Sequence, residues 1–392
     1  MRAFHGLPAL VLLAACSPEP AAVQLADPPA SQGARAVALG VGADRVPRLS
    51  WIEGAGPFEL RTSAWSPAGW EPARVLATGP DWFVNWADVP ALGALDDGTL
   101  AASWLERSGT GSYDYRVRIS LGGATPLVLH DDSGTGEHGF VSLAALDPER
   151  WLAVWLDGRA SGGHHDGSGA MQLRARTVAK RGELGPEVLL DARVCDCCAT
   201  AAERTASGDV LVVYRDRDPD EVRDLAAVLV RPDGSASAPV RVCDDGWKIA
   251  GCPVNGPALA ASGAELAVAW FTLGAESRAR VQVAFSRDGG RTFGAPAQVS
   301  RAETDGFVDC AYDAGGRLWV SWLERPTRER GEWRLAPVVD GVVGEARTLA
   351  ATVPGRAAGI ARLVAAGDGL LFAWLDSSDG ARLRSQWIST AR

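Results

Sequence analysis

Residues Asp97-Gly98-Thr99-Leu100-Ala101-Ala102-Ser103-Trp104 form a turn signal followed by a short apolar run that ends in an aromatic residue. Asp and Gly accept the backbone angles of a tight turn, so the stretch predicts a hairpin that leads into a strand. Similar runs recur at intervals of roughly fifty residues, which is typical of proteins built from repeated modules. Their aromatic ends are Trp51, Trp104, Trp155, Tyr214, Trp270, Trp322 and Trp374.

Seven such modules without any long helical periodicity predict an all-β chain. The economical arrangement is a β-propeller of seven blades, each a sheet of four antiparallel strands. Six blades is the alternative, if the first or the last repeat is partial. We also expect proline to lie at strand starts or edges, because it lacks the hydrogen-bond donor of a sheet ladder.

A second recurring signal, a small or proline residue before an apolar edge, predicts the outermost strand of each blade. The six segments are Glu71–Val75, Thr125–Val128, Gly185–Val188, Ala238–Val242, Ala295–Val299 and Glu345–Leu349. The last repeat has no such segment because the sequence stops at Arg392. We therefore expect Ala22-Val23-Gln24-Leu25, near the N-terminus, to supply the missing strand and close the ring.

The first sixteen residues predict a bacterial lipoprotein signal peptide. Arg2 is followed by an apolar stretch from Leu7 to Ala15, which is too short to span a bilayer. Leu13-Ala14-Ala15-Cys16 matches a lipoprotein cleavage box, so Cys16 would carry the lipid. An ordinary secretory signal with a chance cysteine is the alternative.

This reading divides the chain into a signal peptide (1–16), a tether with the closing strand (17–34) and one propeller domain (35–392). Ser17 after the lipidated cysteine favours the outer membrane of a Gram-negative envelope, facing the periplasm or the exterior. We expect a monomer that meets the membrane only through its lipid.

Composition supports a large core and excludes one class of partner. Apolar and aromatic residues make up 47% of the 392 residues, and the fifteen Trp are expected mainly in the core. The net charge of −9 argues against a nucleic-acid-binding protein, because no basic stripe is available to neutralise phosphates.

Residues 286–293 read Ser-Arg-Asp-Gly-Gly-Arg-Thr-Phe and match the Asp-box, or BNR repeat, of sialidases and related propellers. Beyond this motif, the chain resembles uncharacterised bacterial sialidase-like lipoproteins over most of its length. The resemblance implies a turn between the third and fourth strands of a blade, on the face opposite the usual binding mouth. Its defining residues are Ser286, Asp288, Gly290, Thr292 and Phe293.

The catalytic residues of sialidases do not transfer clearly to this chain. The family uses three Arg, a Tyr nucleophile activated by Glu, and an Asp acid. Tyr312 abuts a turn instead of opening a strand, and Arg45-Val46-Pro47 lies too close to Trp51 for the family's Arg-Ile-Pro start. Sialidase-like exo-glycosidase activity is therefore an alternative, not the first expectation.

Strand order predicts which residues share the mouth of the propeller. In a four-stranded antiparallel blade, the first strand starts and the second strand ends on the same face. The expected starts are Trp82–Trp86, 137–140, Cys195–Cys198, Cys252–Asn255 and 309–310. Loops at one end of a rigid scaffold are where binding residues usually lie.

The mouth would combine arginines with carboxylates. Arginine binds carboxylates in bidentate fashion, so we expect a small anionic or polar ligand, such as a glycan. The candidate ligand-binding residues are Arg107, Arg159, Arg215, Arg217, Arg325, His138, Tyr214 and Asn255.

Two other interpretations of this mouth stay open. Paired carboxylates could hydrolyse a glycosidic bond, with Asp157, Asp216 and Glu324 as the catalytic candidates. Alternatively, Asp157–Arg159 and Arg215–Asp216 are salt bridges that close the ring.

Six cysteines besides Cys16 are expected at the same mouth: Cys195, Cys197, Cys198, Cys243, Cys252 and Cys310. An even number in an exported chain favours disulfides, and our proposed pairs are Cys195–Cys243 and Cys198–Cys252. A metal or redox protein is a further alternative. The Cys195–Cys198 cluster would then bind copper or zinc, with His138 or Met171 nearby, or hold a reactive thiol. No cofactor is required by the first interpretation.

Overall fold

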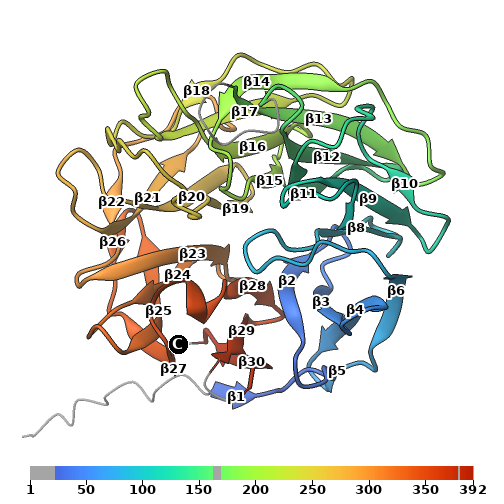
Figure 1. Ribbon diagram of the computed structural model, residues 1–392. Helices are drawn as coiled ribbons and strands as arrows, with labels where there is room; N and C mark the ends of the chain where they lie inside the picture. The colour runs from blue at the N-terminus through green and yellow to red at the C-terminus, as the bar shows by residue number, and fades with distance from the viewer. Residues whose placement is uncertain (1–22, 162–168, 378–379, 392) are drawn as a thin grey trace, which may run out of the picture.

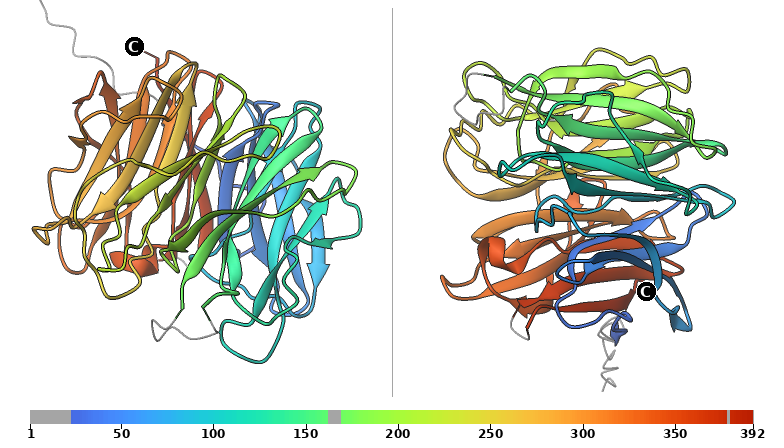
Figure 2. Two further views of the ribbon diagram at one scale, coloured as in Figure 1. Left: turned by 90° about the horizontal axis from the view of Figure 1, so that it is seen from above. Right: turned by 45° about the vertical axis from the view of Figure 1, so that its right-hand side comes forward.

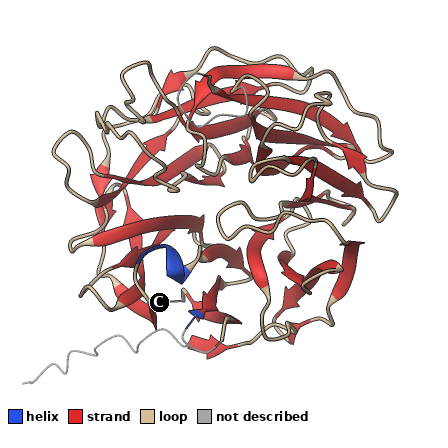
Figure 3. Cartoon of the chain, viewed as in Figure 1, coloured by secondary structure: helices blue, strands red, loops and turns tan. Residues whose placement is uncertain are grey.

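The computed structural model describes residues 23–161, 169–377 and 380–391, which form a wheel of seven antiparallel sheets (Figure 1). Strands make up almost all of the regular structure (Figure 3). The prediction of a seven-bladed propeller is confirmed, and the six-bladed alternative is wrong. Helical structure in the described residues is confined to short 3₁₀ turns such as η1 (Gly355–Ala358), and none of it is long and apolar enough to cross a bilayer.

The first three blades follow one another along the chain. Blade 1 contains β2 (Arg35–Val41), β3 (Pro47–Glu53), β4 (Phe58–Ser66), β5 (Gly69–Trp70) and β6 (Arg74–Gly79). Blade 2 contains β7 (Leu92–Ala94), β8 (Leu100–Arg107), β9 (Tyr115–Leu121) and β10 (Leu127–Val128). Blade 3 contains β11 (His138–Asp147), β12 (Arg150–Asp157), β13 (Met171–Ala179) and β14 (Val188–Val194).

The remaining blades repeat the order. Blade 4 contains β15 (Ala201–Arg204), β16 (Val210–Arg215), β17 (Leu225–Val230) and β18 (Val240–Arg241). Blade 5 contains β19 (Ala258–Ser262), β20 (Glu265–Thr272), β21 (Arg280–Ser286) and β22 (Ala297–Gln298). Blade 6 contains β23 (Thr304–Tyr312), β24 (Leu318–Glu324), β25 (Gly331–Val339), β26 (Val342–Val343) and β27 (Arg347–Thr352). Blade 7 contains β28 (Arg362–Ala366), β29 (Gly369–Asp376), β30 (Arg382–Ser389) and β1 (Val23–Leu25).

The N-terminal strand closes the ring as expected. β1 pairs antiparallel with β30, with Val23 opposite Ile388 and Leu25 opposite Gln386 (Figure 1). The Trp70 indole of blade 1 donates to the Ala26 carbonyl at 2.8 Å, which ties the same segment to the neighbouring blade. Ala22, the first residue of the predicted strand, lies outside the described residues.

The seven marker aromatics occupy equivalent positions. Each lies on the second strand of its blade, and each is at most 6% exposed. Because this strand has a neighbour on both sides and blades packed above and below, its residues lose nearly all contact with water. Burial of a large aromatic contributes about 1.5–3 kcal/mol, so these positions anchor the core. The six predicted outer segments enter the strands β6, β10, β14, β18, β22 and β27.

A repeated contact fastens neighbouring blades near the axis. Asp88 of blade 2 accepts the backbone N–H of Phe140 in blade 3, and Asn255 accepts that of Phe307 in blade 6, both at 2.8 Å. Phe140 and Phe307 have positive φ angles of 52° and 48°. The same backbone irregularity therefore recurs where a polar side chain from the preceding blade binds the inner strand.

The turn at residues 286–293 joins β21 to β22. Because Ser286 pairs with Leu266 near the start of β20, the turn lies on the face opposite the ends of the second strands. Figure 2 shows the blades in two further views. The Asp288 carboxylate accepts the Thr292 hydroxyl at 2.6 Å and the backbone N–H groups of Arg291 and Thr292 at 3.0 Å. Gly290 has φ of 90° and donates its N–H to the Ser286 hydroxyl. The hydrogen bonds from Thr292 lower the pKa of Asp288 to about 2.

Removing the closing strand tests the ring. A chain that begins at residue 27 lacks the β1–β30 pairing and the Trp70 contact, whereas a control that begins at residue 22 keeps both. Since each net hydrogen bond contributes about 0.5–1.5 kcal/mol, we expect the shorter chain to lose about 2 kcal/mol or more of unfolding free energy. Urea denaturation measures the difference, and equal stability of the two chains would contradict the role of β1.

Candidate functional site

A central cavity of about 160 Å³ lies where several inner strands begin. Its wall is formed by β2, β7 and β11, by the loop before β7, by Thr200 just before β15, and by Arg362 at the start of β28. Ligand sites for drug-sized molecules are about 300–1,000 Å³. The cavity is therefore sized for a single small polar group or a sugar-sized ligand.

Two residues of opposite charge, Asp88 and Arg362, line this cavity. Asp88 is 4% exposed, its second oxygen has no hydrogen-bond partner among the described residues, and burial raises its pKa well above the usual value. Arg362 has no carboxylate within 4.0 Å in the described parts of the chain, although its charge partly offsets the raised pKa of the buried Asp309. Glu203 lies on the inner strand β15 and keeps some contact with solvent. The protein around it partly desolvates the carboxylate, which raises its pKa to about 7.

The sequence analysis did not select Asp88, Arg362 or Glu203. The rule that first strands start at the mouth points near Asp88 and Arg362, but not to Glu203, which lies near the other end of β15. Asp88 lies two residues after the segment Trp82–Trp86, and Arg362 opens the first strand of blade 7. Nothing in their local sequence separates them from other charged residues on loops.

Most of the predicted arginines already bind partners within the protein. Arg159 contacts Asp157 at 2.7 Å and Glu187 at 2.9 Å. Arg217 pairs with Asp196 and Glu221, and Arg325 pairs with Glu303 and Asp305. Arg107 is exposed, with its guanidinium 5.4 Å from the Phe83 ring centroid.

Arg215 is buried inside the wall of the mouth and links two blades. It is 1% exposed and donates to the backbone carbonyls of Arg223, Asn255 and Phe271 at 2.6–3.0 Å. Its guanidinium also lies 4.7 Å from the Trp247 ring centroid. Asp216 is not its partner, so the expected Arg215–Asp216 salt bridge is wrong. The prediction failed because the carbonyls that Arg215 binds belong to distant residues, and no sequence pattern indicates such a contact.

The Asp157–Arg159 ion pair is present, but it lies within blade 3 and does not join two blades. The contacts between blades 3 and 4 come from other residues. Arg193 pairs with Glu221 at 3.1 Å, and the Tyr214 hydroxyl donates to Asp191 at 2.6 Å.

His138 lies in a buried polar cluster between blades 2 and 3. Its ring stacks on that of His130, with 3.7 Å between centroids. Its Nε2 lies 3.3 Å from Asp132 and 3.5 Å from Asp157. Burial, followed by the charge of His138, lowers the pKa of His130 to about 4.

The three candidate catalytic carboxylates come from blades 3, 4 and 6 and differ in environment. Burial raises the pKa of Asp157, but hydrogen bonds from Arg159 and Trp155 and the charge of His138 lower it overall. Burial raises the pKa of Asp216. Glu324 lies 3.6 Å from Arg334. Their catalytic roles stay a prediction.

The cysteines form one disulfide among the described residues, between Cys197 and Cys252. Our pairings Cys195–Cys243 and Cys198–Cys252 are wrong, because Cys195, Cys198 and Cys243 are free thiols. Cys195, Cys197 and Cys198 lie within four positions of one another, so their sequence distances to Cys252 are almost equal. The pairing therefore depends on which of the three side chains points toward Cys252. The bond ties the loop before β15 to the loop before β19.

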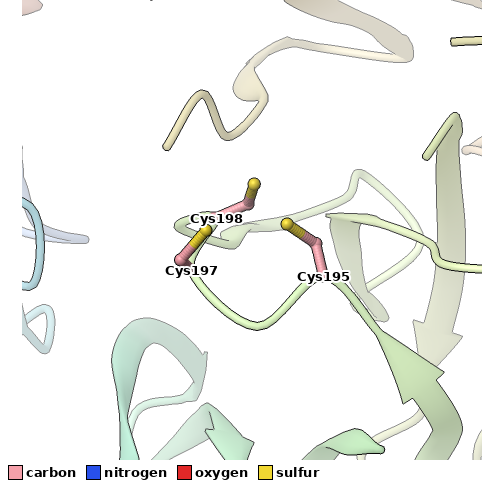
Figure 4. Close-up of side chains that lie close together, drawn as sticks. All are labelled: Cys195, Cys197 and Cys198. Carbon is pink, nitrogen blue, oxygen red and sulfur yellow. The ribbon is translucent and has the colours of Figure 1, made fainter. Parts of the chain in front are cut away.

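Cys195, Cys197 and Cys198 point toward one another in that loop (Figure 4). Burial raises the pKa of the Cys195 thiol, but hydrogen bonds from the Cys198 thiol and the Cys197 backbone, with the charge of Arg223, lower it to about 7. Burial raises the pKa of Cys198 well above its usual value. Met171 and Cys197 pack in the same hydrophobic cluster.

The other two thiols lie elsewhere. Cys310 lies well inside β23 and packs in the core between blades, so the expected strand start at residues 309–310 is wrong: β23 begins at Thr304. Cys243 lies beside Asp224 and Asp245. The Asp224 carboxylate accepts the backbone N–H groups of Gly246 and Trp247. The Asp245 carboxylate accepts hydrogen bonds from the side chains of Trp270 and Gln282.

Comparison with solved structures shows the fold. A lectin, BP39L, from Burkholderia pseudomallei superposes with a TM-score of 0.63 at 13% identity, covering 92% of this chain and 98% of the lectin. A protein of unknown function from Dyadobacter fermentans gives 0.53 at 13% identity, with 94% and 97% coverage. A neuraminidase-like protein from A/bat/Guatemala/164/2009 gives 0.50 at 10% identity, with 91% and 88% coverage.

The chain is thus a seven-bladed β-propeller, and its fold is similar to those of this lectin and this neuraminidase-like protein. No family model and no curated protein matches its sequence. At identities this low, the likeness establishes architecture and leaves function to the site.

The buried His130 predicts a pH dependence of stability. Its folded-state pKa of about 4 lies below the ordinary value of 6.5, so its contribution is complete above about pH 6.5 and is lost as the pH falls toward 4. We expect this group to cost about 2 kcal/mol between pH 7 and pH 5. In His130→Phe, which keeps the ring stacking, the loss of unfolding free energy over that interval should shrink by this amount. Urea titrations at both pH values measure it, and an unchanged pH dependence would refute the assignment.

Proposed function

We propose that this protein is an envelope-anchored binding propeller whose central cavity holds a small polar ligand with an anionic group, such as an acidic sugar of a glycan. The observation that carries the proposal is the position of Arg362 in the wall of this cavity. Arg362 supplies a positive charge that no carboxylate neutralises within 4.0 Å in the described residues.

The chemistry of Arg362 suits such a ligand. Its guanidinium can donate two parallel hydrogen bonds to a carboxylate. A ligand that carries a carboxylate would therefore match the positive charge in the cavity wall.

Binding is better supported than glycoside hydrolysis. Hydrolysis needs an acid and a second carboxylate open to the sugar from opposite sides. The Asp157 side chain is completely buried, and its oxygens accept hydrogen bonds from Trp155 and Arg159. No bond cleavage is therefore part of the proposal.

Removing the Arg362 guanidinium should weaken binding. Charge-assisted hydrogen bonds contribute about 1.5–3 kcal/mol, so Arg362→Ala should lower the affinity for the ligand at least tenfold. A glycan array with acidic and neutral sugars identifies the ligand, and calorimetry then compares the variants. Arg287→Ala is the control, since its side chain is 71% exposed on the Asp-box turn at the opposite face. Binding of no sugar at all, or equal affinity of Arg362→Ala, would sink the proposal.

We further propose that the propeller is displayed from a bacterial membrane through a lipid on Cys16. The support is the cleavage box before Cys16, followed by a tether that leads into the closing strand β1. The propeller itself contributes no membrane-spanning helix in its described residues.

A single substitution tests the anchor. Cys16→Ser removes the only thiol that the lipid can occupy in the cleavage box, so the protein should move from the membrane to the soluble extracytoplasmic fraction. Fractionation with mass spectrometry of the N-terminus measures this, and Cys310→Ser serves as the control. Retention of Cys16→Ser in the membrane fraction would contradict lipid anchoring.

A further inference from the structure

Four cysteines converge at the mouth, although a staple between two loops requires only two. Cys197 and Cys252 form the interblade disulfide. Cys195 and Cys198 are additional free thiols at the same place, and both are at most 2% exposed. The sulfurs of Cys195, Cys197 and Cys198 all lie within 4.8 Å of one another. The staple does not explain the second pair.

The backbone around this sulfur cluster is held from several sides. Cys195 donates its N–H to the Arg215 carbonyl at 3.0 Å, and the Arg215 side chain donates to the Asn255 carbonyl at 3.0 Å. One arginine therefore fixes the spacing of the two cysteine loops. Arg356, from the loop between blades 6 and 7, donates to the Cys252 carbonyl at 2.6 Å. Such supporting contacts preorganise a site before any ligand enters.

Positive charge surrounds the sulfurs. The Arg223 guanidinium lies 3.4 Å from the Cys195 sulfur, and Glu221 holds this arginine in place at 2.9 Å. Arg215 is buried in the same wall. Several thiolates can share one buried site only if cations compensate their charge, and N–H groups directed at thiolate sulfurs are typical outer partners of metal–thiolate centres.

We propose that the reduced cluster binds one soft, thiophilic cation, Zn²⁺ or Cu⁺, through Cys195, Cys197, Cys198 and Cys252. Thiolates select these ions over harder ones. Tetrahedral Zn–S bonds of about 2.3 Å place the sulfurs ~3.8 Å apart. The sulfurs of Cys195, Cys197 and Cys198 already lie within 4.8 Å of one another, and Cys252, bonded to Cys197, supplies the fourth sulfur once the disulfide is opened. This inference goes beyond ligand binding at the central cavity and does not depend on it.

The site exists only after the disulfide is opened. An external dithiol reductant supplies two electrons and two protons to the Cys197–Cys252 bond and is itself oxidised to a disulfide, which yields two thiols. Four thiols then lose their protons as the cation binds, so that every sulfur enters as a thiolate. The same chain therefore has an oxidised form with a staple and a dithiol, and a reduced form with a four-sulfur site.

The group Asp224, Cys243 and Asp245 offers a useful contrast. It also gathers three potential ligands, but both carboxylates already accept hydrogen bonds from backbone and side-chain donors. It is therefore a hydrogen-bonded structural cluster. The sulfur cluster differs in its ligand atoms, because its three sulfurs are soft ligands and two of them are free thiols.

The test titrates the purified full-length protein, reduced and freed of reductant under anaerobic conditions, with Zn²⁺ and with Cu⁺ in separate arms against competing chelators. Co²⁺ serves as an optical probe, because tetrahedral thiolate coordination gives it strong charge-transfer and visible bands. We expect one equivalent of metal on the reduced protein and at least tenfold weaker binding on the oxidised protein. The two arms decide which ion is preferred.

Variants locate the site. Cys195→Ser and Cys198→Ser should each lower the affinity of the reduced protein at least tenfold, whereas Cys310→Ser, a buried cysteine in blade 6, should leave it unchanged. Thermal melting checks that each variant is folded. The comparison of reduced with oxidised wild-type protein keeps the test valid even if a variant does not fold.

Three outcomes would overturn the assignment. One is equal metal binding by the oxidised and reduced proteins, and another is unchanged binding by folded Cys195→Ser. The third is a reduced protein that binds neither ion but reversibly forms a Cys195–Cys198 disulfide, detected by intact mass before and after alkylation. That result would assign a redox dithiol in place of a metal site.

Discussion

Ring closure is the constraint on which the rest of the structure depends. A four-stranded blade is apolar on both faces and buries them only against two neighbours, so a row of blades is stable when its ends meet. Here the ends meet through β1 and β30, which place three N-terminal residues in the last blade. The inner strands then converge around the axis, and polar side chains such as Asp88 and Asn255 fasten each strand to the next blade.

This closure turns the mouth into a shared surface of residues that are far apart in the chain. Arg362 from blade 7 lines the same cavity as residues of β2, β7 and β11. Cys197 and Cys252, separated by 55 positions, form a covalent bond between neighbouring blades. Chemistry at such a place needs no local motif, because the scaffold brings the groups together. A family resemblance in one turn therefore says little about the mouth.

The arginines near the mouth differ in whether they have partners within the protein. Arg159, Arg217 and Arg325 bind carboxylates, and Arg215 binds three carbonyls, so these guanidinium groups mainly stabilise the wall. Arg362 is different, since no carboxylate lies within 4.0 Å of its guanidinium in the described residues and it lines the cavity. The sulfur cluster lies just before Ala199 and Thr200, which line the cavity, so the two proposed sites are close along the chain.

The sequence by itself determined the number of blades, the positions of the seven core aromatics, the outer strands and the closing strand. These features follow from short patterns of apolar, turn and proline residues, whose meaning does not depend on distant contacts. Only the tertiary structure decided that Cys197 bonds Cys252, that Arg215 is buried among carbonyls, and that Arg362 and Asp88 line one cavity. Those outcomes depend on side-chain direction and on neighbours in other blades. A change of a few ångströms exchanges one cysteine partner for another without altering any sequence pattern.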